Sequence, residues 1–279
     1  MKVLLIGGNS FVGSSFYKIY KKNIFLSSRN KDSQFYLEFS TINEDFFKQV
    51  GKEKITHCFF LAAISSPDEC ETEFKKANST NVISTKKIIS RLLEMSIKII
   101  FFSSDQVYPD TNTTFSTDYP CIPKSKYGEM KKDIEDAFLY NTNFKIFRLS
   151  YIYDASDGFL KYIENCAKSG KEAEIYKDFA RNIIHINDVI ECMNVAVINW
   201  NEVKKISNIC GPECLSRVEM TDVIKKKLYN SLKFKIVEAS EKFWKARTKV
   251  CNLDPNDTKS ILKRAPISFE KFLEGYHEN

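Results

Sequence analysis

The stretch Val3-Leu4-Leu5-Ile6-Gly7-Gly8-Asn9-Ser10-Phe11-Val12-Gly13 decides the fold. Its leading apolar residues predict a buried strand, and the residues after the glycines have the spacing of a helix. Gly7 permits a tight turn, Gly13 permits close contact between helix and strand, and a helix N-terminus attracts pyrophosphate. The pattern predicts a dinucleotide-binding loop formed by Gly7, Asn9, Ser10, Phe11, Val12 and Gly13. A glycine-rich turn without a ligand is the alternative, because Ser10 replaces the usual middle glycine.

Further apolar runs follow at residues 24–26, 58–64, 97–102 and 144–147, with helical patterns between them. Apolar strands separated by helices indicate a parallel sheet covered on both faces, and residues 82–93 predict one long connecting helix. The predicted fold class is therefore α/β, a doubly wound parallel sheet of Rossmann type. The pattern loosens after Arg148. We predict a dinucleotide-binding domain over residues 1–150 and a smaller mixed α/β lobe over residues 151–279, some segments of which return to the first domain.

The composition excludes several classes of protein. The 279 residues are 43% hydrophobic and 28% charged, which rules out a disordered or fibrous chain. The net charge of +6 comes from interspersed basic and acidic residues and gives no reason to expect a nucleic-acid partner. Eight cysteines without a Cys-x-x-Cys pair, and three histidines, predict neither a metal site nor a disulfide framework. No apolar run approaches the roughly 18 residues of a membrane span, so we expect no membrane partner and a cytoplasmic location.

The second predicted strand runs into Ser27-Ser28-Arg29, where a carboxylate usually binds the ribose 2′-hydroxyl of NAD. No carboxylate stands there, and the Arg29 guanidinium suits a 2′-phosphate instead. Ser28 and Arg29 therefore predict a preference for NADP(H), with NAD(H) as the alternative cofactor. Arg29 as a solvated surface cation is the other interpretation.

A Tyr-x-x-x-Lys pair on a helix places a phenol and an ammonium on one face, where the cation can lower the phenol pKa and steady it as a proton donor. The pattern occurs three times, at Tyr17/Lys21, Tyr127/Lys131 and Tyr229/Lys233. Only Tyr127 follows the strand at residues 97–102, whose end brings the Ser104 hydroxyl to the carboxyl edge of the sheet. We therefore select Tyr127 and Lys131 as the candidate pair.

These motifs occur together, and in the same order, in one known family. They are the loop at residues 7–13, Leu61-Ala62-Ala63, Asn81, the segment 103–108, Tyr127/Lys131, and the segments 148–153 and 181–189. On these residues the chain resembles the extended short-chain dehydrogenases/reductases, which are NAD(P)-dependent sugar-nucleotide epimerases, dehydratases and reductases. The similarity covers nearly the whole length. It implies that Leu61, Ala62 and Ala63 line the cofactor site.

The resemblance also implies catalytic roles. Tyr127 is the implied general acid/base, Lys131 is its electrostatic partner and holds the nicotinamide ribose, and Ser104 donates a hydrogen bond to the reacting carbonyl. A ketone that accepts a hydride gains charge on its oxygen, so a hydroxyl donor and a nearby proton suit the reaction. Asn81 either supports the helix geometry around the site or is a surface amide.

Two segments narrow the choice among the reactions of this family. Sugar 4,6-dehydratases of the family carry Thr-Asp-Glu where this chain has Ser104-Asp105-Gln106, and an amide cannot ionise, which disfavours a dehydratase. Asp105 is either a substrate contact or a turn-forming side chain. Residues 246–259 resemble the C-terminal segment of the dTDP-4-dehydrorhamnose reductase-like branch, although the proline expected after Arg247 is absent.

That branch implies a nucleotide-diphosphate sugar as the substrate. Arg181 and Arg247 suit a clamp on its diphosphate through their guanidinium forks, with surface ion pairs as the alternative. Tyr151 follows the strand at residues 144–147 and either lines the sugar pocket or packs internally. The family also implies a homodimer.

The sequence therefore predicts an NADP(H)-dependent reductase of a keto group, at C4, on a nucleotide-linked deoxysugar. Among enzymes, the alternative is an NAD-dependent nucleotide-sugar epimerase. The alternative from another class is a non-catalytic regulatory subunit with the same fold, similar to the β subunit of methionine adenosyltransferase. Turnover separates that subunit from an enzyme.

Overall fold

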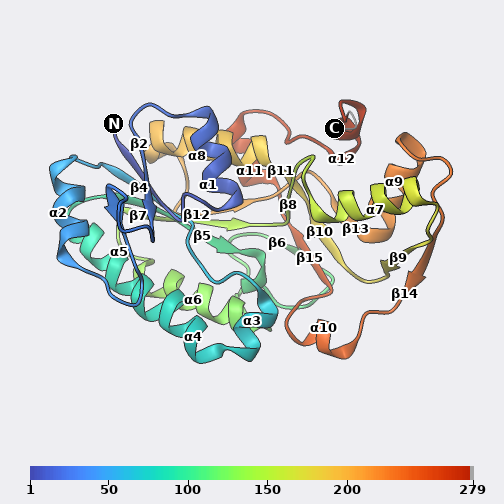
Figure 1. The fold of residues 1–279 in the computed structure, drawn as a ribbon, viewed down its shortest axis with the longest axis horizontal. Coiled ribbons are helices and arrows are strands. Elements are labelled where there is room, and N and C mark those ends of the chain that lie inside the picture. Colours follow the sequence, from blue (N-terminus) through green and yellow to red (C-terminus); the bar gives the residue numbers. More distant parts are fainter. Residues whose placement is uncertain (277–279) are drawn as a thin grey trace.

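Seven parallel strands form the main sheet of the computed structural model, which describes residues 1–276 (Figure 1). Their order across the sheet is β12-β7-β5-β4-β1-β2-β3. Every neighbouring pair is parallel, so the carboxyl ends of the strands meet at one edge. The predicted doubly wound α/β fold is confirmed. The strands are β1 (Val3–Ile6), β2 (Ile24–Ser28), β3 (Phe35–Tyr36), β4 (His57–Phe60), β5 (Lys98–Ser104), β7 (Phe144–Leu149) and β12 (Ile206–Ile209).

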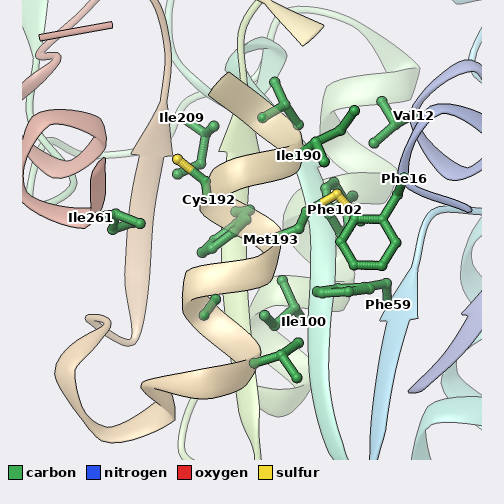
Figure 2. Packing of buried hydrophobic residues seen from close by; sticks show 14 of the residues in the cluster. Val12, Phe16, Phe59, Ile100, Phe102, Ile190, Cys192, Met193, Ile209 and Ile261 are labelled. Carbon is green, nitrogen blue, oxygen red and sulfur yellow. The ribbon is translucent and has the colours of Figure 1, made fainter. Parts of the chain in front are cut away.

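Helices cover both faces of this sheet, which explains why its strands are largely apolar. One face carries α1 (Phe11–Ile19), α8 (Ile186–Ile198) and α11 (Asn256–Leu262), and the other carries α2 (Glu44–Lys52), α5 (Thr85–Glu94) and α6 (Lys126–Phe138). Figure 2 shows the first face, where Phe16 of α1 and Ile190 of α8 lie over Phe59 and Phe102 of the strands. The Phe16 and Phe59 rings meet edge to face, with centroids 5.2 Å apart.

Two predicted elements have different bounds in the structure. The helix expected at residues 82–93 belongs to a longer helical segment, which runs through α4 (Phe74–Asn78), a π-helical turn η1 (Ser79–Ser84) and α5. The strand expected at residues 58–64 ends at Phe60 as β4. The apolar run continues beyond the strand because the next residues line a cleft instead of the sheet.

The second half of the chain, together with the strand β6 from the first half, forms a smaller mixed α/β lobe, and it also returns to the main sheet. A four-stranded sheet of order β13-β10-β15-β6 and the strand pairs β8/β11 and β9/β14 build this lobe. In the other direction, β12 pairs with β7 at the edge of the main sheet, and α8 and α11 pack over it. The domain boundary at residue 150 stays a prediction. The lobe strands are β6 (Thr114–Phe115), β8 (Ile152–Tyr153), β9 (Ala173–Tyr176), β10 (Ala180–Asn182), β11 (Ile184–His185), β13 (Cys214–Ser216), β14 (Phe234–Val237) and β15 (Val250–Leu253).

The remaining helices are mostly short. They are α3 (Pro67–Thr72), α7 (Gly158–Ser169), α9 (Arg217–Lys227), α10 (Glu241–Lys245), α12 (Phe269–Glu274) and the 3-10 turns η2 (Asp105–Val107) and η3 (Trp200–Glu202). No helix within residues 1–276 combines the length and the hydrophobicity that a membrane crossing requires. In the same part of the chain, no three His, Cys, Asp or Glu side chains gather as a metal ion would require.

Candidate active site

A cleft of about 1280 Å³ opens at the carboxyl edge of the main sheet. Its walls include the segments that follow β1, β2, β4 and β5, which is where an open parallel sheet binds ligands. Of the residues predicted to bind cofactor or substrate or to act in catalysis, Gly13 is the one that does not line the cleft. The predicted residues that line the cleft are Gly7, Asn9, Ser10, Phe11, Val12, Ser28, Arg29, Leu61, Ala62, Ala63, Ser104, Asp105, Tyr127, Lys131, Tyr151, Arg181 and Arg247.

The loop after β1 makes a tight turn and then starts α1. Gly7 has φ +88°, and a Cβ at this position would lie 2.6 Å from the Ala62 nitrogen. Ser10 does not disturb the loop, because its hydroxyl accepts a hydrogen bond from the Gly13 amide at 3.2 Å and caps α1. Gly13 itself packs against the backbone, since a Cβ there would lie 2.8 Å from Gly8 Cα. The serine thus supplies a helix cap at a position where glycine is usual.

The wall after β4 is fixed by Asn81 from the π-helical turn. The buried Asn81 side chain accepts a hydrogen bond from the Ile64 amide at 2.8 Å and donates one to the Ile64 carbonyl at 2.9 Å. The Cys70 thiol donates to the same carbonyl at 3.2 Å. Of the two interpretations that the sequence left open, Asn81 is therefore the buried support and not a surface amide.

Tyr127 and Lys131 lie one turn apart on α6 and both line the cleft, whereas Tyr17 and Tyr229 do not. The N-terminus of α6 is capped by Ser125, whose hydroxyl accepts from the Gly128 amide at 3.1 Å. Gly128 brings this helix against the turn after β5, since a Cβ there would lie 2.2 Å from the Gln106 carbonyl oxygen. This contact sets Tyr127 beside the segment that carries Ser104.

Burial dominates the electrostatics of this pair. The Lys131 ammonium donates to the Phe102 carbonyl at 2.7 Å and lies 4.7 Å from the centre of the Phe101 ring. Burial lowers the pKa of Lys131 to about 8, and the Glu135 carboxylate opposes that shift. Burial also raises the pKa of Tyr127, and the Asp105 carboxylate adds to the effect. Burial and the Asp105 carboxylate set this direction, and the Lys131 ammonium, which donates to a backbone carbonyl, does not reverse it. That Lys131 steadies the phenol as a proton donor stays a prediction.

The depressed pKa of Lys131 predicts a pH-dependent stability. Between about pH 8 and 10.5 the unfolded lysine stays protonated while the folded one is neutral, so the free energy of unfolding rises with pH across this window. Below about pH 8 both states are protonated, and the contribution of Lys131 no longer changes with pH. We expect the wild type to gain up to about 3 kcal/mol relative to Lys131→Met between pH 7.5 and 10.5, measured by urea unfolding. A constant difference between the two proteins would contradict a buried, shifted lysine.

Nearly the whole chain matches a known family. Residues 1–276 match the model described as the RmlD substrate binding domain. The chain belongs to this family. The match confirms the resemblance to the dTDP-4-dehydrorhamnose reductase-like branch that the sequence predicted.

Solved structures have a fold similar to that of this chain. A hypothetical dTDP-4-dehydrorhamnose reductase from Sulfolobus tokodaii has a TM-score of 0.83 at 20% identity, over 97% of this chain and 99% of that one. UDP-glucuronic acid 4-epimerase from Bacillus cereus, solved with UDP-glucuronic acid and NAD, has a TM-score of 0.78 at 20% identity, over 98% and 97% of the two chains. At these identities the likeness establishes the fold alone.

The matches to curated relatives cover less of this chain than the structural matches do. ADP-L-glycero-D-manno-heptose-6-epimerase from Brachyspira hyodysenteriae is 26% identical over 80% of both chains. Methionine adenosyltransferase 2 subunit beta from Rattus norvegicus is 26% identical over 50% of this chain, and the match spans only 43% of the length of that relative.

The two arginines predicted to bind the substrate differ in their surroundings. The buried Arg181 guanidinium lies 3.2 Å from an Asp105 carboxylate oxygen and also donates to the carbonyls of Ala180, Thr248 and Lys249. The N–H groups of the Arg181 guanidinium are therefore directed into the protein interior. Asp105, the first residue of the turn η2, forms this ion pair and accepts from the Ser104 hydroxyl at 3.1 Å. A role of Arg181 at the substrate stays a prediction.

Arg247 and Tyr151 lie on the wall contributed by the smaller lobe. The Arg247 guanidinium forms a two-pronged ion pair with Asp68, with N–O distances of 2.8 and 2.6 Å. The Tyr151 hydroxyl donates to Asp157, and its ring lies 4.4 Å from the Arg217 guanidinium carbon. Tyr151 thus combines internal contacts with a position on the cleft wall.

Sequence reasoning missed one wall of the cleft. Residues 37–40 follow β3, whose carboxyl end lies at the same sheet edge as the phosphate loop. The strand was missed because it is only two residues long. The one signal in the sequence that could have indicated this strand is the apolar and aromatic run at residues 35–37, which Glu38 follows. Other cleft residues that were not predicted include Lys76, Ser79, Thr80, Ser84, Gln106, Ser150 and Phe179.

Proposed function

We propose that this protein is an NADP(H)-dependent reductase of a keto group, at C4, on a nucleotide-linked deoxysugar. The observation that carries the proposal is that Ser104, Tyr127 and Lys131 line the same cleft as the phosphate loop, in a chain of the RmlD family. A dinucleotide suits this loop, because Gly7 lets the turn after β1 pack directly on the Ala62 backbone, and Ser10, the N-cap of α1, is on the cleft wall, so that a helix N-terminus, which attracts pyrophosphate, lies at the cleft. When bound, the cofactor supplies a hydride to the carbonyl carbon.

The side chains of the cleft supply the rest of the reaction. As the carbonyl carbon gains a hydride, the bonding pair of the C=O group moves to oxygen, and Tyr127 gives that oxygen its phenolic proton. The raised pKa of Tyr127 keeps the phenol protonated at neutral pH, ready to donate. The Lys131 ammonium then stabilises the tyrosinate. The Ser104 hydroxyl now donates to Asp105, and rotation about its C–O bond redirects that proton to the carbonyl oxygen.

Arg29 decides the cofactor preference in this proposal. It is exposed on the cleft wall after β2, beside Ser28, and no carboxylate follows directly. We expect NADPH to bind at least about tenfold more tightly than NADH, and Arg29→Ala to erase the difference, as measured by isothermal titration. Lys31→Ala is the matched control, since Lys31 is an exposed cation two residues away that does not line the cleft.

An NAD-dependent nucleotide-sugar epimerase is the second candidate. Two observations favour it: the heptose epimerase match spans 80% of both chains, and the Glu38 carboxylate stands on the same wall as Arg29, where it disfavours a 2′-phosphate. A preference for NADH in the titration above would move this candidate ahead. The regulatory-subunit alternative is disfavoured because a binding subunit has no use for the Ser104, Tyr127 and Lys131 arrangement.

A further inference from the structure

The ion pair between Arg247 and Asp68 joins two distant parts of the chain at the cleft. Asp68 is in the first turn of α3, in the segment after β4, and Arg247 follows α10 of the smaller lobe (Figure 1). Each guanidinium Nη donates to a different carboxylate oxygen, at 2.8 and 2.6 Å. The hydrogen bonds from Arg247 hold the pKa of the Asp68 carboxyl below its usual range.

The surroundings of Arg247 leave its planar face and its fork in a fixed orientation. The guanidinium carbon lies 4.4 Å from the centre of the Phe243 ring, and Nη1 also donates to the Phe243 carbonyl at 3.3 Å. The fork is filled by a carboxylate, which presents the same pair of oxygens that a phosphate group does. Asp68 therefore occupies the place of an anionic ligand.

This carboxylate is open to exchange. The Asp68 side chain is 54% exposed and the Arg247 side chain 17% exposed, so water can take over the carboxylate when another anion enters the fork. Exposed ion pairs contribute little to stability, which makes the exchange inexpensive for a ligand with more than one negative charge. A singly charged anion would gain nothing over Asp68, because it carries the same charge as the carboxylate that it displaces.

We propose that Asp68 is an internal competitor for the Arg247 fork and sets both the affinity and the charge selectivity of the site for a nucleoside diphosphate. The inference rests on the proposed function and on the role of Arg247 predicted from the sequence, a clamp on the substrate diphosphate. Binding of the diphosphate breaks the Asp68 ion pair, and the free energy of that pair is subtracted from the free energy of binding. Asp68 is thus a residue that determines specificity without touching the ligand.

The test is a set of calorimetric titrations with UDP, dTDP and ADP, each measured separately against the full chain. We expect Asp68→Asn to tighten binding of the preferred diphosphate roughly fivefold. Glu73→Gln is the matched control: it removes the same charge at the end of α3 from an exposed position, and we expect a change of less than about twofold. In an Arg247→Gln background, Asp68→Asn should have no effect on affinity.

Two results would overturn the inference, and they can be told apart. If Asp68→Asn binds as the wild type does while Arg247→Gln binds more weakly, Arg247 is a diphosphate ligand and Asp68 is not its competitor. If Arg247→Gln binds as the wild type does, or if none of the three diphosphates binds, the substrate assignment fails and the competitor role fails with it.

Discussion

Replacement of Tyr127 by Phe is expected to lower kcat by at least about 100-fold and to leave dinucleotide affinity nearly unchanged. The phenolic proton is lost, while the ring still packs beside Met130 and Val82. The measurement is NADPH consumption with a 4-keto sugar nucleotide that the wild type reduces. Unchanged dinucleotide binding in the variant shows that the cleft is intact and assigns the loss to chemistry.

The matched control is Tyr17→Phe, which removes the same hydroxyl from another Tyr-x-x-x-Lys pair that lies outside the cleft. We expect this control to retain wild-type turnover. A Tyr127→Phe protein that keeps more than about a tenth of the wild-type kcat would show that another group gives the proton. A wild type that turns over no keto sugar, yet binds a protein partner, would revive the regulatory-subunit alternative.

The second large effect concerns the buried ion pair behind the candidate site. Glu135, one turn beyond Lys131 on α6, meets Arg148 of β7 with an N–O distance of 2.6 Å, and both side chains are at most 3% exposed. Glu135 also accepts from the Ser103 hydroxyl at 2.5 Å, and Arg148 donates to the Tyr108 hydroxyl at 2.7 Å. Removal of one partner leaves the other charge buried without compensation.

We expect Arg148→Met to lower the free energy of unfolding by about 3 to 5 kcal/mol in urea denaturation, and Glu135→Gln in the same chain to restore much of it, because the second change removes the stranded charge. The control is Lys86→Met, which breaks an exposed pair between Lys86 of α5 and Asp133 of α6 and should cost less than about 1 kcal/mol. Equal losses for Arg148→Met and Lys86→Met would mean that the buried pair is not a structural requirement.

Local features of the site could be predicted from the sequence because local rules govern them. The phosphate loop, the strand that ends at Ser104 and the pair Tyr127/Lys131 each depend on residues a few positions apart. The wall at residues 37–40 escaped prediction because a strand of two residues has no periodicity to detect.

Long-range contacts could not be predicted from the sequence for a different reason. A sequence shows that Arg181 is an arginine, but only the topology brings it to Asp105 and turns its donors inward. The same holds for Arg247 and Asp68, which are 179 positions apart. The direction of the Lys131 and Tyr127 pKa shifts also depended on burial, which a helical spacing does not report.

The return of β12 to the main sheet has a consequence for synthesis of the protein on the ribosome. An emerging chain that has reached residue 150 has made six of the seven strands, but the outer edge of β7 stays unpaired and Phe59 and Phe102 lack the cover of α8. Such an intermediate presents an unpaired strand edge and an exposed hydrophobic sheet face, and both features promote aggregation of nascent chains. Chaperones should therefore stay bound to the nascent chain until β12 and α11 have left the exit tunnel.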